Sequence, residues 1–344
     1  MTPEQLRDEI DSLLKTAGVK NNRKLVRRML ETAVNLGTDD IQRLDLKITS
    51  AALAEMRDAF NIFHPHLHVP KVTVFGSART QEHDPLYELA KDVAERLAAH
   101  QWMVVTGAGP GIMQAAAEGA GNDYSIGVSI RLPFEEAPNA QVQENPKLAT
   151  MKYFFTRKLM LMKESLGFVC LPGGFGTMDE VFELFTLQQT GKSVPTPIVL
   201  LDRPGGNFWS GLKKYIDEEL VTLGTISEDD MDRALITDSA EAAVDEILAF
   251  WKNYHSLRWV DKQLIFRLRH EPTDAEIAQL NEEFSHLLET GEFARTEPFP
   301  EEEHNREHLD LARIVFTPKP RAVGSLHYII RAVNRFETAT AVTS

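Results

Sequence analysis

Glycines that follow three short apolar runs are the residues of this sequence best placed to bind an anion. The three turns are residues 75–79 with Gly76 and Ser77, residues 106–113 with Gly107, Gly109 and Gly111, and residues 171–180. In the third turn, Gly173, Gly174 and Gly176 permit positive φ and let backbone amides approach a ligand closely. We expect Thr177 to begin a helix, whose first amides lack intrahelical partners and carry partial positive charge. A phosphate could bind there without a cationic side chain.

Glu180 is the candidate catalytic carboxylate, because it lies beside this third turn. The spacing from Thr177 to Glu180 is also that of a capping box, in which the two side chains bond each other's backbone amides. Taken alone, the pattern favours that structural explanation. The neighbouring glycine turn favours a catalytic one, and Glu183, one helical turn further, is a second carboxylate near the same face.

Arg157 and Lys158 form a basic pair upstream, early in a helix that we expect to run from about residue 153 towards residue 164. Adjacent basic residues usually mark the solvated face of a helix. This helix, however, leads into the strand that ends at Pro172, so both side chains can flank the same crevice.

The second turn does not have the spacing of a dinucleotide site. Gly107, Gly109 and Gly111 read G-x-G-x-G, whereas the dinucleotide fingerprint is G-x-G-x-x-G. The nearest acid that could bind a ribose, Asp123, precedes the next strand instead of ending it. NAD is therefore disfavoured, and no Gly-Lys-Ser/Thr follows that would make a P-loop.

No metal or cofactor is expected. His64, His66 and His68 resemble a ligand row, but two of them flank a proline in a linker and no carboxylate is close in sequence. The single cysteine, Cys170, excludes an internal disulfide and a cysteine-based zinc site. Nothing identifies a Schiff-base lysine, so a decarboxylase is unsupported.

Five apolar runs alternate with amphipathic, helix-like segments, and they predict the fold. These runs are residues 72–75, 103–105, 126–130, 168–171 and 198–201. Between the first two, Asp84 suits an N-cap and Pro85 the first helical position of a helix over 84–100. The pattern predicts an α/β, doubly wound parallel sheet of the Rossmann-like type, which binds ligands at the carboxyl ends of its strands.

The whole chain of 344 residues predicts three segments. We expect an N-terminal helical segment over 1–68, a catalytic Rossmann-like domain over 69–253 and a small α/β unit over 258–344. In the last, strands are expected at 263–268 and 312–316, and helices at 274–288 and 325–334.

The net charge of −14 disfavours nucleic-acid polymers. There is no signal peptide and no apolar run of about 20 residues, so we expect a cytoplasmic protein without membrane contact.

The combined motifs resemble those of the LOG family of phosphoribohydrolases, formerly labelled lysine decarboxylases, over roughly residues 70–250. The residues that match its signature PGGxGTxxE are Pro172, Gly173, Gly174, Gly176, Thr177 and Glu180. Arg157 and Lys158 match its upstream RK pair, and the first two glycine turns also fit. The short family members have methionine where this chain has Phe154 and a glycine turn one residue longer, so the resemblance is to the larger bacterial branch.

The resemblance implies a Rossmann-like, usually homodimeric protein that cleaves a nucleoside 5′-monophosphate into free base and ribose 5-phosphate. Known substrates include cytokinin riboside monophosphates and AMP. It also implies that Arg157 and Glu180 are essential. A different class, a non-catalytic sensor or carrier of nucleotide or molybdenum cofactor, is the alternative.

In such a reaction, Glu180 would stabilise positive charge on the ribose and activate water, with Arg157 positioning it or stabilising charge on the departing base. We expect Phe154 to pack in the core, with stacking on the base as the alternative. The expected binding residues are Gly76, Ser77, Gly107, Gly109, Gly111, Phe154, Lys158, Gly173, Gly174, Gly176, Thr177 and Glu183.

Overall fold

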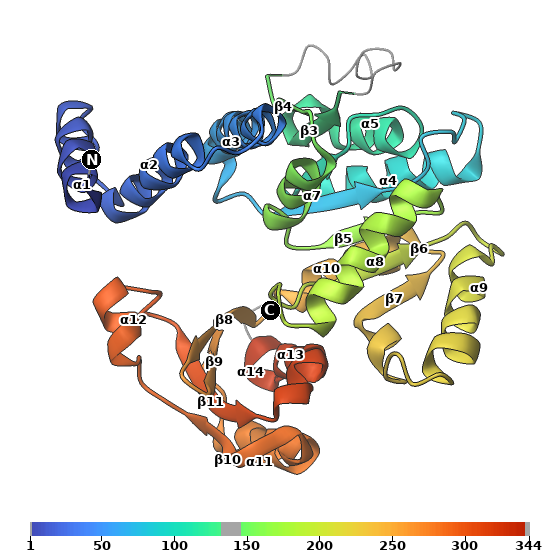
Figure 1. Cartoon of the computed structure of the whole chain (residues 1–344). Coiled ribbons are helices and arrows are strands. Elements are labelled where there is room, and N and C mark those ends of the chain that lie inside the picture. Colours follow the sequence, from blue (N-terminus) through green and yellow to red (C-terminus); the bar gives the residue numbers. More distant parts are fainter. Residues whose placement is uncertain (1, 132–145, 341–344) are drawn as a thin grey trace. The chain divides into compact units, whose positions relative to one another are not determined.

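The computed structural model describes residues 2–131 and 146–340, which form two compact units, 1–60 and 61–344 (Figure 1). The first unit contains helices α1 (Pro3–Thr16) and α2 (Arg23–Thr38) and most of α3 (Arg43–Phe63). Helix α1 begins with a capping box: the Thr2 hydroxyl accepts from the Gln5 amide, and the Gln5 side chain accepts from the Thr2 amide.

The second unit contains a seven-stranded sheet in which every pairing is parallel, as predicted. Its strands are β1 (Lys71–Phe75), β2 (Met103–Thr106), β3 (Ser125–Ile130), β4 (Leu148–Met151), β5 (Phe168–Cys170), β6 (Ile198–Leu201) and β7 (Ala234–Thr237). Their order is β4-β3-β2-β1-β5-β6-β7, so the chain proceeds in opposite directions on the two sides of the β1–β5 pair. Doubly wound sheets bind ligands at such a switch point, outside the carboxyl ends of the strands.

Helices cover both faces of this sheet (Figure 1). Helices α4 (Pro85–Ala99), α5 (Ile112–Tyr124) and α10 (Ala240–Phe250) pack on one face, where the Val72 and Val74 side chains of β1 are fully buried. Between them, Thr73 points to the opposite face and donates a 2.8 Å hydrogen bond to Leu161 O in α7 (Phe154–Lys163). The predicted start of α4 is confirmed, because the Asp84 carboxylate accepts from Leu86 N and Pro85 is the first helical residue.

The C-terminal part of the second unit contains an antiparallel sheet of order β10-β11-β9-β8. Its strands are β8 (Tyr254–Val260), β9 (Gln263–Leu268), β10 (Leu288–Arg295) and β11 (Ala312–Pro318), and its helices are α11 (Asp274–Phe284), α12 (Pro300–Asn305), α13 (Leu326–Asn334) and α14 (Glu337–Thr340). The strands expected at 263–268 and 312–316 are confirmed. The helix expected over 274–288 is too long, because it ends at Phe284 and Leu288 already pairs with Pro318 in the sheet.

A buried ion cluster joins α12 to this antiparallel sheet. The Glu302 carboxylate is fully buried and accepts hydrogen bonds from Arg267 Nε at 2.8 Å, Arg313 Nε at 3.2 Å and Phe299 N at 3.1 Å. Burial alone would raise the pKa of Glu302, but these hydrogen bonds hold it below its ordinary value. The buried carboxylate is paired with two guanidinium groups and hydrogen-bonded to them, and a buried charge is tolerated only when it is paired in this way.

Within the described residues, no helix is long and apolar enough to cross a membrane.

Candidate active site

The three predicted turns meet at the carboxyl ends of β1, β2 and β5. The Ser77 amide donates to Pro172 O at 3.2 Å, and the Ile112 amide donates to Ser77 O at 3.0 Å. These bonds connect the turn after β1 with the turns after β5 and β2. The glycine segments therefore lie side by side at the switch point of the sheet.

Several glycines are required here by packing between the turns. A Cβ at Gly76 would overlap Ile112, and one at Gly173 would overlap the Thr177 hydroxyl. Gly111 has φ +68°, and a Cβ there would overlap the Ser77 carbonyl. At Gly109, a Cβ would lie 2.6 Å from Met113 Cε. A side chain at Gly76 or Gly111 would push the first two turns apart, and one at Gly173 would displace Thr177, whereas at Gly109 the flexible Met113 side chain could move aside.

Gly173, Gly174 and Gly176 do not use the positive φ that glycine permits, since none of the three lies in the left-handed region. Gly174 is an extended N-cap residue with φ −86°, and Gly176 lies in the first turn of the helix that follows. Among the described residues, a Cβ at Gly174 or Gly176 would meet no atom within 4 Å apart from its neighbours in the chain and in the helix. Neither backbone strain nor packing against the described part of the chain requires glycine at these two positions, and their small size leaves space beside the helix terminus.

Helix α8 (Phe175–Gln189) begins two residues earlier than predicted, at Phe175 instead of Thr177. Its N-cap is Gly174, and among the described residues no side chain caps this end. The first intrahelical bond runs from Met178 N to Gly174 O, at 3.0 Å. The capping-box explanation of Thr177 and Glu180 is therefore wrong, and the amides of residues 175–177 precede the first intrahelical donor.

Arg157 is anchored at the ends of β2 and β3. Its Nε donates to Val128 O at 2.9 Å and its Nη2 to Gly107 O at 3.3 Å, and only 11% of the side chain is exposed. A Cβ at Gly107 would overlap the guanidinium, so that glycine makes room for the arginine. The solvated-face alternative is wrong for Arg157, which points into the site.

Glu180 lies in the first half of α8 with its Oε1 3.7 Å from Arg157 Nη1 and 11% of its side chain exposed. Burial raises the pKa of Glu180 to about 7, and Asp179 and Glu183 add to this rise, while Arg157 and Lys158 oppose it. A carboxyl group with this pKa is present in both protonation states near neutral pH. It can therefore accept or donate a proton there.

Lys158 connects α7 with α8. Its Nζ lies 2.7 Å from Asp179 Oδ2 and 2.5 Å from Glu183 Oε2, and only 15% of its side chain is exposed. Although burial opposes it, the hydrogen bonds that Lys158 donates to the two carboxylates raise the pKa of Lys158, so the ammonium is charged. The substrate-binding roles expected for Lys158 and Glu183 stay predictions.

Two aromatic rings near these residues are exposed. Phe154 does not pack in the core as expected, because 55% of it is exposed at the start of α7. Phe175, between Gly174 and Gly176, is 96% exposed. Sequence reasoning did not select Phe175, although a large apolar residue between two glycines of a binding turn is a usable signal.

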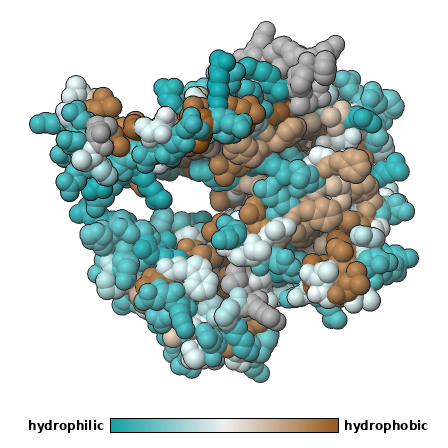
Figure 2. Space-filling model, viewed as in Figure 1, coloured by the Kyte–Doolittle hydropathy of each residue, from teal (hydrophilic) through white to brown (hydrophobic). Residues whose placement is uncertain are grey.

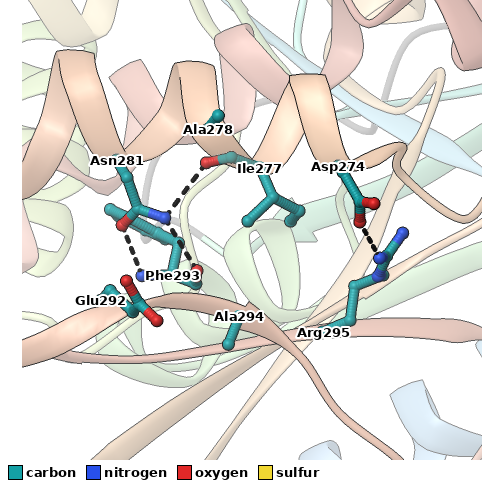
Figure 3. A pocket seen from close by; sticks show the side chains of 8 residues that line it. All are labelled: Asp274, Ile277, Ala278, Asn281, Glu292, Phe293, Ala294 and Arg295. Atoms are coloured by element: carbon teal, nitrogen blue, oxygen red, sulfur yellow. Dashed lines mark hydrogen bonds and ion pairs between the residues drawn. The ribbon is translucent and has the colours of Figure 1, made fainter.

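A hollow of about 460 Å³ lies between α11 and β10, and none of the predicted site residues lines it (Figure 3). Its Asn281 side chain accepts from Phe293 N and donates to Phe293 O and Ile277 O, while Arg295 pairs with Asp274. These polar groups hold the helix to an edge strand. Among the described residues, no cluster of three His, Cys, Asp or Glu side chains is placed to hold a metal ion.

Fold and site together define a Rossmann-like α/β protein with a buried Arg–Glu pair at its switch point. The family model described as "Possible lysine decarboxylase" matches residues 111–247. Over 172 residues, the chain is 32% identical to the cytokinin riboside 5'-monophosphate phosphoribohydrolase of Mycobacterium tuberculosis, covering 48% of this chain and 88% of that protein. A probable enzyme of the same name from Arabidopsis thaliana is 29% identical over 151 residues, which cover 43% of this chain and 72% of that protein. The chain belongs to this family, the LOG family.

Solved structures are similar at lower identity. The molybdenum cofactor carrier protein of Chlamydomonas reinhardtii is 22% identical with a TM-score of 0.37, covering 53% of this chain and 99% of that one. DNA processing protein A from Helicobacter pylori is 17% identical with a TM-score of 0.38, covering 53% and 82%. Neither likeness bears on function.

Proposed function

We propose that this chain hydrolyses the N-glycosidic bond of a nucleoside 5′-monophosphate to free base and ribose 5-phosphate. The observation that carries the proposal is the buried Arg157–Glu180 pair, 3.7 Å apart, with the pKa of Glu180 raised to about 7. Its place at the switch point, beside a helix terminus that no described side chain caps, supports the same conclusion. The relatives named as phosphoribohydrolases support the reaction type.

The 5′-phosphate binds at the start of α8 in this proposal. The amides of residues 175–177 and the positive end of the helix dipole provide donors for an anion. The open space beside Gly174 and Gly176 gives a phosphate access to them. Gly76, Ser77, Gly107, Gly109, Gly111, Gly173 and Thr177 shape the surrounding wall.

Glu180 acts on the reacting carbon of the sugar. As the bond between C1′ and the base breaks, its electron pair leaves with the base and positive charge develops on the ribose. The Glu180 carboxylate stabilises that charge and takes a proton from the water that attacks C1′. Arg157 is permanently cationic and cannot serve as a base, so it positions Glu180 and stabilises negative charge on the departing base.

The base and the assembly are further parts of the proposal. The exposed Phe154 ring can stack on the planar base of AMP or of a cytokinin riboside monophosphate.

The protein acts as a cytoplasmic homodimer. Four apolar side chains that are exposed on α7 and α8 support such a contact, namely Phe155, Leu159, Phe175 and Phe182. Figure 2 shows brown, hydrophobic surface over these helices.

A panel of nucleoside 5′-monophosphates, with detection of ribose 5-phosphate and free base, tests the proposal. We expect at least one monophosphate to be hydrolysed, and the matching nucleoside to react poorly because the phosphate aligns the sugar. Equal efficiency with AMP and adenosine would contradict the phosphate site. Tight binding of nucleotides without any hydrolysis would favour a carrier or sensor.

A further inference from the structure

Helices α7 and α8 carry the two members of the catalytic pair, and a second ionic contact connects them beside it. We propose that Lys158 is a positioning residue, which holds α8 against α7 and thereby sets the separation of Arg157 and Glu180. This inference rests on the proposed function, but it gives Lys158 a role other than phosphate binding.

Lys158 of α7 forms ion pairs with two carboxylates of α8, and we call these two contacts the clamp. Its Nζ bonds Asp179 at 2.7 Å and Glu183 at 2.5 Å, and these two residues flank Glu180 on α8. Two of its three ammonium protons are therefore taken by carboxylates of this protein. A nucleotide phosphate at Nζ would have to displace one of them and would lie beside the other negative charge.

The catalytic pair needs such a clamp because it does not fix its own geometry. The 3.7 Å between Arg157 and Glu180 exceeds a hydrogen bond. Arg157 is fixed by carbonyls of β2 and β3, whereas Glu180 moves with α8. Lys158 follows Arg157 directly on α7, so its contact with α8 lies at the level of the pair. Displacements of about 1 Å can cost about 100-fold in rate.

The clamp also balances the charges that face Glu180. Arg157 and Lys158 face it from α7, Asp179 and Glu183 are on its own helix, and Cys170 of β5 is neutral because burial raises the pKa of its thiol. Removal of the lysine leaves two carboxylates uncompensated beside Glu180. Removal of both carboxylates leaves an uncompensated lysine. The two changes therefore shift the ionisation of Glu180 in opposite directions.

The test compares Lys158→Met, Lys158→Arg and the double variant Asp179→Asn/Glu183→Gln in the full chain, with Lys163→Met as control. Lys163 is an exposed lysine near the end of the same helix. For release of ribose 5-phosphate from AMP, or from the best monophosphate of the panel, we expect kcat to fall about 10- to 100-fold in Lys158→Met and the double variant. KM should change little, and Lys158→Arg should restore part of kcat.

The pH profile gives a second readout. Activity of Lys158→Met should require a pH about half a unit or more higher than wild type, and activity of the double variant a lower pH. If Lys158→Met instead raises KM at unchanged kcat, and the double variant lowers KM, the lysine is a phosphate ligand. Unchanged kcat, KM and pH profile in both would make the clamp a surface ion pair, and either result overturns the inference.

Deuterium exchange without substrate tests the clamp independently of any activity. Peptides that cover residues 154–163 and 175–189 should exchange faster in Lys158→Met and in the double variant than in wild type or Lys163→Met. Unchanged exchange would overturn the positioning role. If both variants exchange faster than wild type but wild type releases no ribose 5-phosphate, the proposed function is contradicted while the positioning role of Lys158 stands.

Discussion

Two glutamates of this protein are buried beside arginines, yet their pKa values move in opposite directions. At the switch point of the parallel sheet, burial raises the pKa of Glu180 to about 7. On α12, beside the antiparallel sheet, the pKa of Glu302 lies below its ordinary value, although that side chain is fully buried. Proximity to arginine therefore does not decide whether the pKa of a buried glutamate is raised or lowered.

Hydrogen bonding explains the difference. Glu302 accepts from Arg267, Arg313 and the Phe299 amide, all within 3.2 Å, which favours the charged form. At the other site, Arg157 already donates to two backbone carbonyls and stands 3.7 Å from Glu180. Glu302 is stabilised in its charged form by these hydrogen bonds and holds α12 to the sheet. Glu180 is stabilised less in its charged form, so it can exchange a proton near neutral pH.

The largest effect is expected from Glu302→Gln, which removes the charge between two buried arginines. Breaking a buried ion pair on one side typically costs about 3–5 kcal/mol, because the remaining charge is uncompensated. Urea unfolding at pH 7 should show this loss in the free energy of unfolding. Glu303→Gln, at an exposed neighbour on the same helix, should change it by about 0.5 kcal/mol or less. Equal effects of the two substitutions would mean that the cluster does not stabilise the fold.

Glu180→Gln should have the next largest effect, on catalysis. It keeps the size of the side chain but removes the charge, so turnover of the best nucleoside monophosphate should fall at least about 100-fold. Glu88→Gln, at an exposed position of α4, is the matched control and should retain turnover. Near-normal turnover of a folded Glu180→Gln variant would show that the carboxylate is not catalytic.

A smaller effect is expected on stability, and only at high pH. The pKa of Glu180 is about 7 in the fold and 4.5 ordinarily, so folding favours the neutral form. The contribution of the neutral Glu180 carboxyl group to the free energy of unfolding is complete below pH 4.5 and is lost as the pH rises through 7. Glu180→Gln should thus raise the free energy of unfolding at pH 8.5, by up to about 3 kcal/mol for a pKa difference of about 2.5. Thermal unfolding at pH 5 should show little difference, and an equal gain at both pH values would refute the assignment.

The parallel sheet was predictable because its central strands are continuous apolar runs. All five predicted runs form strands, and the meeting of three glycine turns follows from their parallel order. Strands β4 and β7 were missed because each lies at an edge of the sheet and is only partly buried, so neither is a continuous apolar run. Strands β8 and β10 lie at the edges of the antiparallel sheet and carry too many polar residues to appear as apolar runs.

The site was predictable in its residue types and not in its contacts. The signature selected Arg157 and Glu180, and the structure brings them together. The start of α8 was misplaced because Gly174 caps it without a side chain, which leaves no sequence signal of the kind that serine or aspartate gives. The engagement of Lys158 by two carboxylates depends on how α7 and α8 pack, and no spacing within either helix encodes it.

The most direct measurement is the pH dependence of kcat/KM for the best nucleoside monophosphate, for wild type and Glu180→Gln. We predict that wild-type kcat/KM rises from pH 5 and levels off with a midpoint near 7, because free Glu180 must lose its proton to act. Glu180→Gln should be low and without this rise. A wild-type profile that is flat from pH 5 to 9, or a rise that persists unchanged in Glu180→Gln, would contradict the account.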